Sequence, residues 1–102
     1  MVIKLEITVP ATFGGDWESS PGEMYRTIEL FEPPYIGMKL LFPEMRCYRE
    51  DKGPISIMDV AYDADRNTYV AITSKISIPG RYVDQCKGWK HKFLNNESAL
   101  AL

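Results

Sequence analysis

The chain has 102 residues and a formal net charge of −2, with 45% hydrophobic and 25% charged residues. This composition predicts a single folded domain with its own core and argues against intrinsic disorder. No apolar run approaches the roughly 18 to 20 residues of a membrane helix. The first six residues also lack the basic segment and apolar block of a signal peptide. We therefore expect a cytoplasmic protein that has no contact with a membrane.

The first third of the chain predicts two strands with a loop between them. Residues 2–9 alternate apolar and polar side chains, as a half-buried strand does, and Pro10 is expected to end that strand. Residues 11–23 hold three glycines, a proline and Trp17, a composition typical of a long loop. Residues 24–31 form the second predicted strand, with Ile28 and Leu30 expected to face inward.

The middle of the chain predicts two further short strands. Residues 35–42 are apolar enough for a third strand, kinked at Gly37 because glycine interrupts strand packing. Residues 45–48 are expected to form a short edge strand. The charged segment 49–54 is then predicted to be a turn.

Residues 55–78 carry the strongest signal, a β-hairpin. Two runs of β-branched and aromatic residues flank the polar segment 63–67, whose Asp and Asn residues favour turns. If Tyr62 faces Thr68, the even-numbered positions share one apolar face that the register buries. That face would hold Met58, Val60, Val70 and Ile72. The apolar positions are odd-numbered before Met58, which predicts a bulge near residues 57–58.

The last quarter of the chain predicts mostly short elements. Pro79 and Gly80 match the central pair of a type II turn. Residues 82–83 are expected to form a last short strand, and residues 84–94 a short helix. Residues 95–102 are expected to be a tail, so that the domain spans residues 1–94.

Several short strands punctuated by Pro and Gly, with no strong helical period, predict an all-β fold. We expect a small five- to six-stranded barrel or β-roll with a short C-terminal helix. Residues 34–40, 57–63 and 69–72 together resemble the SH3-like small barrels of uncharacterised bacterial and phage proteins, in which a proline–x–x–glycine entry leads a strand and a tight hairpin follows. The resemblance implies a barrel and no particular activity.

A metal site and a cofactor are not expected. Asp63, Asp65 and Asn67 copy the first three ligand positions of a calcium loop, but the sixth position is Thr68 rather than Gly and the twelfth is Ser74 rather than Glu. A hairpin turn explains the same three side chains.

The single histidine and the two cysteines do not predict a catalytic site either. His91 has Cys86 five residues before it, whereas Cys47 is distant, and structural zinc usually takes four ligands with closely spaced Cys pairs. No local signature supports a Cys–His nucleophile pair, so we expect no enzyme. In a cytoplasmic protein the two thiols are expected to be free; an oxidising compartment would allow a disulfide between them.

Charge is distributed unevenly. Residues 1–32 carry six acidic and two basic side chains, whereas residues 81–93 carry four basic and one acidic side chain. These segments could attract each other within one molecule or between copies. Residues 81–93 also interleave bases with aromatic residues, the mixture that binds phosphates and stacks on unpaired bases. The candidate interaction surface is Trp17, Tyr35, Arg81, Tyr82, Lys87, Trp89, Lys90 and Lys92.

Each aromatic candidate has a second interpretation. Trp17 is either a plug over the core or an anchor for a partner, since Trp is enriched at binding hot spots. Tyr35 either lines a peptide groove or simply follows the strand-ending prolines. Trp89 is expected to cap an open barrel end, with the lysines solvated.

The main hypothesis is a non-enzymatic binding or accessory module that acts through protein–protein contact, with self-association included. The alternative is a single-stranded nucleic-acid-binding barrel that uses residues 81–93. Against the alternative, the whole chain is acidic, with a pI near 5.3.

Overall fold

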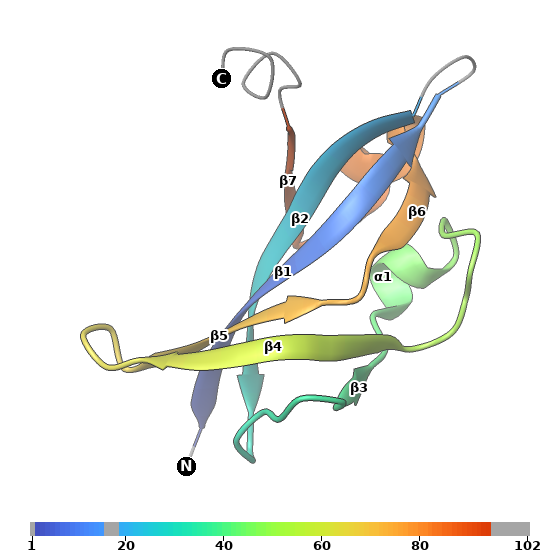
Figure 1. Ribbon diagram of the computed structural model, residues 1–102. Helices are drawn as coiled ribbons and strands as arrows, with labels where there is room; N and C mark the ends of the chain where they lie inside the picture. Colours follow the sequence, from blue (N-terminus) through green and yellow to red (C-terminus); the bar gives the residue numbers. More distant parts are fainter. Residues whose placement is uncertain (1, 16–18, 95–102) are drawn as a thin grey trace.

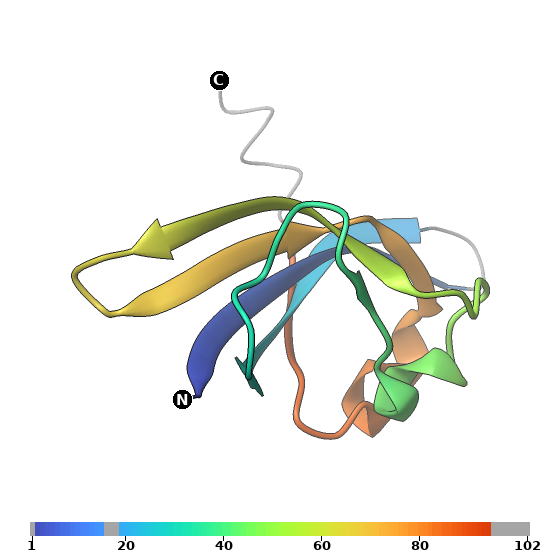
Figure 2. The same ribbon diagram turned by 90° about the horizontal axis from the view of Figure 1, so that it is seen from below.

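The computed structural model describes residues 2–15 and 19–94, so Trp17 and the predicted tail, residues 95–102, lie outside the described part. The fold is all-β and barrel-like: one curled sheet of mixed strand directions forms a half-barrel (Figures 1 and 2). Its elements are β1 (Ile3–Gly14), β2 (Ser19–Leu30), β3 (Lys39–Leu40), α1 (Pro43–Arg46), β4 (Ile55–Asp63), β5 (Thr68–Thr73), β6 (Ile76–Pro79), the 3₁₀ helix η1 (Gly80–Gln85) and β7 (Lys90–Phe93). The described residues thus hold seven strands, where five or six were expected.

Strand β1 lies at the centre of the sheet. The order across the sheet is β3-β4-β5-β1-β2-β7, and β6 also pairs with β1. On one side β1 pairs antiparallel with β2 along its whole length, from Ile3 opposite Leu30 to Gly14 opposite Ser19. The predicted strand end at Pro10 and the predicted loop over residues 11–23 are therefore wrong. In place of the loop, β1 and β2 form one long hairpin.

Two prolines are compatible with this hairpin because their missing N–H groups face away from the β1–β2 ladder. The amide of Leu94 donates to the Pro21 carbonyl, so Pro21 directs its backbone groups away from β1 and towards β7. Backbone groups alternate in direction along a strand, so the N–H and C=O groups of Glu23 also point towards β7. Pro10 lies opposite Glu23, and its backbone groups therefore point away from β2, to the other side of β1. On that side the parallel pairing is interrupted between Thr8 and Ala11. Pro10 thus lies where no donor is required.

The hairpin of β4 and β5 forms as predicted, but its register differs by one residue. Tyr62 lies opposite Tyr69 and Val60 opposite Ala71, not opposite Thr68 and Val70. The predicted bulge is confirmed, because the register shifts between Ile57 and Asp59. On β4 the bulge changes the core-facing position from the odd Ile57 to the even Val60, as predicted. The core-facing positions of β5 are odd, because Ala71 and not Val70 lies opposite Val60, so the predicted even-numbered core face is wrong for Val70 and Ile72.

A second irregularity separates β5 from β6. Thr8 pairs with Ile72 and Ala11 with Ile76. An advance of three residues along β1 therefore corresponds to four residues from β5 to β6, so the partner segment holds one extra residue. The inserted residue changes the buried positions from odd in β5 to even in β6. Ile76 and Ile78 are therefore buried, although Ile72 is exposed.

The segment between β2 and β4 is less extended than predicted. The expected strand over residues 35–42 is reduced to β3, because Gly37 has a φ of 93° and forms a turn in which the Met38 amide donates to the Tyr35 carbonyl. The expected strand over residues 45–48 is replaced by α1. Pro43 begins that helix, where its fixed φ suits the first helical position.

The end of the described chain also differs from the prediction. Gly80 does not have the positive φ of a type II turn and instead starts η1, which replaces the predicted strand over residues 82–83. The predicted helix over residues 84–94 is wrong. Gly88, with a φ of 85°, turns the chain so that β7 can pair with β2.

The core lies between the concave face of the sheet and the two helices, which sit side by side at one end of the sheet (Figures 1 and 2). β1 supplies every second residue to the core, α1 supplies Met45 and η1 supplies Val83. Ile28 and Leu30 of β2 pack against this core from its partly buried margin, as predicted. The contributions of β1 are Leu5, Ile7, Val9, Ala11 and Phe13.

The β1–β2 hairpin generates a prediction about two glycines. A methyl group at Gly22 would overlap the Phe13 ring and the Lys92 carbonyl, whereas one at Gly14 would only touch the Pro79 backbone at 3.9 Å. We expect Gly22→Ala to lower the free energy of unfolding by about 1 to 3 kcal/mol, the usual cost of overpacking. The Gly14→Ala control should change it by much less. Urea unfolding of both variants measures the difference, and equal stabilities would contradict the close packing of β2, β7 and Phe13.

Candidate functional site

Trp89, the most prominent aromatic residue of the predicted surface, is buried. Its side chain is 8% exposed, and its ring meets the Phe42 ring edge-on at a centroid distance of 4.9 Å. The indole Nε1 donates a hydrogen bond of 2.8 Å to Glu44 Oε1, and Arg26 forms an ion pair with the same oxygen. Trp89 thus ties the start of β7 to α1 and β2, as expected of a cap rather than of a stacking platform.

Tyr82 and Arg81 form a second stack on the helical side. The Tyr82 ring lies 5.0 Å from the Tyr48 ring at an interplanar angle of 28°, and the Arg81 guanidinium lies 4.8 Å from the centre of the Tyr82 ring. Tyr82 is only half-buried, but its ring is packed against both Tyr48 and Arg81. These contacts join η1 to the segment after α1.

The three candidate lysines are exposed, and two of them lie on β7. Lys92 Nζ is 3.9 Å from Glu23 Oε1 and 5.7 Å from the Tyr25 ring centre. The adjacent Tyr25 hydroxyl, and then Glu23, raise the pKa of Lys92. Lys87 and Lys90 are exposed as well. Since β2 and β7 are neighbours, the acidic N-terminal third and the basic segment meet within one molecule.

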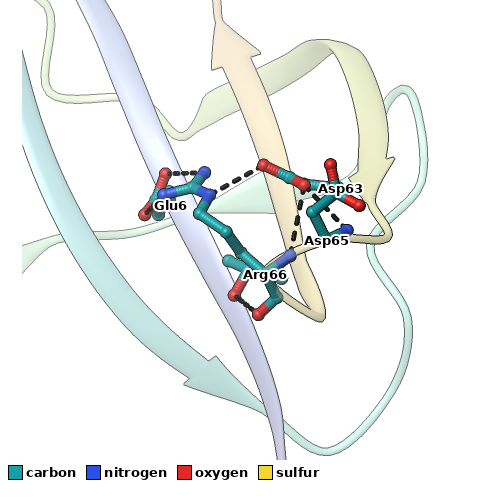
Figure 3. A network of polar contacts seen from close by, with 5 residues as sticks. Glu6, Asp63, Asp65 and Arg66 are labelled. Carbon is teal, nitrogen blue, oxygen red and sulfur yellow. Dashed lines mark hydrogen bonds and ion pairs between the residues drawn. The ribbon is translucent and has the colours of Figure 1, made fainter.

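The residues that copied a calcium loop form a hairpin turn instead (Figure 3). Asp63 accepts hydrogen bonds from the amides of Asp65 and Arg66 at 3.2 and 3.3 Å, and it forms an ion pair with Arg66 Nε at 2.7 Å. Arg66 also binds both oxygens of Glu6 on β1, at 2.7 and 2.8 Å. The hydrogen bond from Arg66 lowers the pKa of Asp63, and the bidentate contact with Glu6 raises the pKa of Arg66.

Metal-binding clusters and membrane-spanning helices are both missing from residues 2–15 and 19–94. This part of the chain holds no cluster of three or more His, Cys, Asp or Glu side chains that could bind a metal ion. His91 is half-buried, with its ring 6.1 Å from Phe13 and 5.8 Å from Phe93. None of the helices described there is long and apolar enough to cross a membrane.

A groove that the sequence did not predict lies where β1 begins. It has a volume of about 480 Å³, and its wall combines the start of β1, Pro33 and the tip of the β4–β5 hairpin. Tyr62 and Tyr69 stand side by side in it with ring centres 4.9 Å apart, and the Tyr62 hydroxyl is hydrogen-bonded to Asn67. The lining residues are Val2, Ile3, Lys4, Pro33, Tyr62, Arg66, Asn67 and Tyr69.

Strongly exposed apolar side chains lie on the segments that form this groove or adjoin them. Residues 31–38 cross the end of the curled sheet on their way from β2 to β3 (Figure 2). The Gly37 amide donates to the Ile57 carbonyl, which holds Tyr35 and Ile36 beside the bulge at Met58. We call this set the apolar rim; its members, each at least 49% exposed, are Val2, Phe31, Tyr35, Ile36, Met58 and Tyr62.

Of the eight predicted surface residues, only Tyr35 belongs to the apolar rim. Trp17 lies outside the described residues, and the other six lie on η1, on β7 and in the turn between them. Sequence reasoning missed Met58 because it placed this bulge residue on the buried face of the hairpin. It missed Tyr62 because that side chain, although it shares the face of Val60, is still 49% exposed. The predicted bulge was the signal that could have found Met58, since a bulge directs one residue out of the alternating pattern.

Comparison of the chain with protein-family models, with curated proteins and with solved structures gave no match. The candidate site is therefore defined by its geometry alone.

The two cysteines are free in the structure and differ in exposure. Cys47 is exposed, whereas Cys86 is 2% exposed and its Sγ lies 3.6 Å from the Tyr82 carbonyl. Burial raises the pKa of Cys86 to about 11. We expect a thiol reagent at pH 8 to modify one cysteine in the folded protein and both after unfolding, because a buried thiol is neither ionised nor accessible. Rapid modification of both in the folded state would contradict the packing of η1.

Proposed function

We propose that this protein is a non-enzymatic binding module that acts through contact with proteins, self-association included. The observation that carries the proposal is the apolar rim around the tyrosine groove. Apolar side chains from three segments far apart in the sequence are exposed there, and two of them, Val2 and Tyr62, line the groove. Contiguous exposed apolar surface of this kind marks interaction sites.

The chemistry of the groove suggests how a protein partner would bind. Tyr62 and Tyr69 present flat aromatic surface, and Lys4, Arg66 and Asn67 offer polar atoms beside it. Pairs of aromatic side chains with a few polar neighbours suit extended peptides, which pack apolar side chains against the exposed faces of the rings. The resemblance to SH3-like barrels stays a prediction, and the turn at Gly37 and the tight β4–β5 hairpin support it. A cytoplasmic location is part of the proposal, supported by the two free thiols.

The apolar rim can be tested with its two most accessible aromatic residues. Phe31 is 86% exposed and Tyr35 is 58% exposed, so replacing either by Ser should leave the stability of the domain almost unchanged. We expect Phe31→Ser and Tyr35→Ser to lose the proteins that the unaltered chain captures from its source cells. Ile72→Ser is the matched control, since Ile72 is 49% exposed on a different surface. Capture that is equal in all three variants would contradict a role for the rim.

The alternative function, binding of single-stranded nucleic acid, rests on the exposed lysines of residues 81–93. It needs aromatic rings that bases can reach, and Trp89 and Tyr82 are both packed against other side chains. We expect titration with an oligonucleotide to show only weak, non-specific binding. Tight binding that falls steeply with salt, and that disappears when Lys87, Lys90 and Lys92 are replaced by Glu, would favour the alternative.

A further inference from the structure

One edge of the sheet is open over five residues. β1 covers β2 along its whole length, but on the other side β7 pairs only with residues 22–25. Figure 1 shows β2 continuing well past the start of β7. Among the strands that the structure describes, none pairs with residues 26–30 on this side. We call residues 26–30 the open edge.

The open edge presents backbone N–H and C=O groups that no described strand pairs with. The hydrogen bond from Leu94 to the Pro21 carbonyl shows that Pro21 faces β7. By the two-residue alternation of a strand, Thr27 and Glu29 direct their N–H and C=O groups the same way, beyond the start of β7. Both residues are exposed. An added strand would therefore find two donors and two acceptors at the usual spacing.

The other edges of the sheet, within the described residues, are protected against such pairing. The outer strand β4 has a bulge at Met58, and the Val60 amide is already bound to the Asp59 carboxylate at 2.9 Å. β7 is four residues long and carries the exposed Lys90 and Lys92. Bulges, short length and lysines are the usual means by which soluble proteins block edge pairing. The open edge has neither a bulge nor a proline, and its one inward charge, Arg26, is paired with Glu44.

We infer that the occupant of the open edge is the same edge of a second copy of this chain, paired antiparallel about a two-fold axis at Ile28. The inference rests on the proposed function, because it names one of the protein partners. Centred at Ile28, each Thr27 lies opposite Glu29 of the other copy, and these pairs exchange four backbone hydrogen bonds. Ile28 meets its own copy on the concave side, where opposed side chains approach most closely.

The charges of the edge favour this register over the one centred at Glu29. Centring the axis at Glu29 would place two carboxylates directly opposite each other, which is unfavourable. Centring it at Ile28 pairs each carboxylate with a threonine. It also brings the strongly exposed Phe31, which follows β2 directly, to the margin of the contact. The edge is thus self-complementary, as a two-fold contact requires.

The test is the mass of the full chain in solution. We expect sedimentation equilibrium over roughly 1 µM to 1 mM, the range of weak to moderate complexes, to show a monomer–dimer equilibrium. Thr27→Pro removes one edge donor from each copy while leaving the β1 ladder intact, so it should weaken the dimer roughly thirtyfold. Thr27→Ala keeps the amide and is the matched control that should still dimerise. Urea unfolding checks that the variants are folded.

A charge exchange tests the register. Thr27→Glu should weaken the dimer because the introduced carboxylate would face Glu29 of the other copy, and adding Glu29→Lys should restore it. A chain that is monomeric at every concentration overturns the inference, as does a dimer that Thr27→Pro does not weaken. Either result leaves the proposed function standing if the rim variants still lose captured proteins. If the protein dimerises as described but the rim variants still capture the same proteins, only the role of the rim is overturned.

Discussion

The whole structure depends on the hydrogen bonding of β1 on both of its sides. On one side it holds β2 in antiparallel register over twelve residue pairs. On the other it holds β5 and β6 in parallel register, in two blocks separated by an inserted residue. A parallel pair needs a long connection between its strands, and here that connection is everything from β2 to β4. The central strand therefore determines where each later segment must pass.

The insertion opposite Pro10 explains the shape of the molecule. Because it reverses the buried side of the partner strand, β5 and β6 diverge in direction while both contribute to the core (Figure 1). The β4–β5 hairpin is carried away from the helices, and its tip is fastened to β1 by the contact between Arg66 and Glu6 (Figure 3). At the other end Glu44 joins α1 to Arg26 and Trp89. The core is closed by helices at one end and left open at the other, where the tyrosine groove and the apolar rim lie.

The two surfaces proposed for binding share this cause. Residues 31–38 cross the open end because β2 finishes there and β3 must reach the far side of β4. Their apolar side chains exceed what the core can cover at that point, so Phe31, Tyr35 and Ile36 face water. The open edge of β2 arises in the same region, since β7 is too short to follow β2 to its end. A second copy and other protein partners would thus approach neighbouring parts of the molecule, which adjoin at Phe31.

The sequence by itself determined the class of the fold and the features set by local chemistry. The alternation from Ile3 to Val9, the hairpin turn at residues 63–67 and the bulge after Ile57 all follow from side-chain period and turn preferences. The capping role of Trp89 was expected as well, because a large aromatic side chain near the end of a small barrel gains most by covering the core.

Only the tertiary structure decided the features that depend on pairing between distant strands. Pro10 and the glycines after it predict a loop, yet Pro10 lies within a strand, because its missing donor falls in a gap of the parallel ladder. The hairpin register, the exposure of Met58 and Tyr62, and the strand at residues 90–93 were likewise mispredicted. A shift of one residue reverses the face of every side chain in a strand. Which face is buried, and so which residues can meet a partner, is fixed by the neighbouring strand and cannot be read from the local pattern.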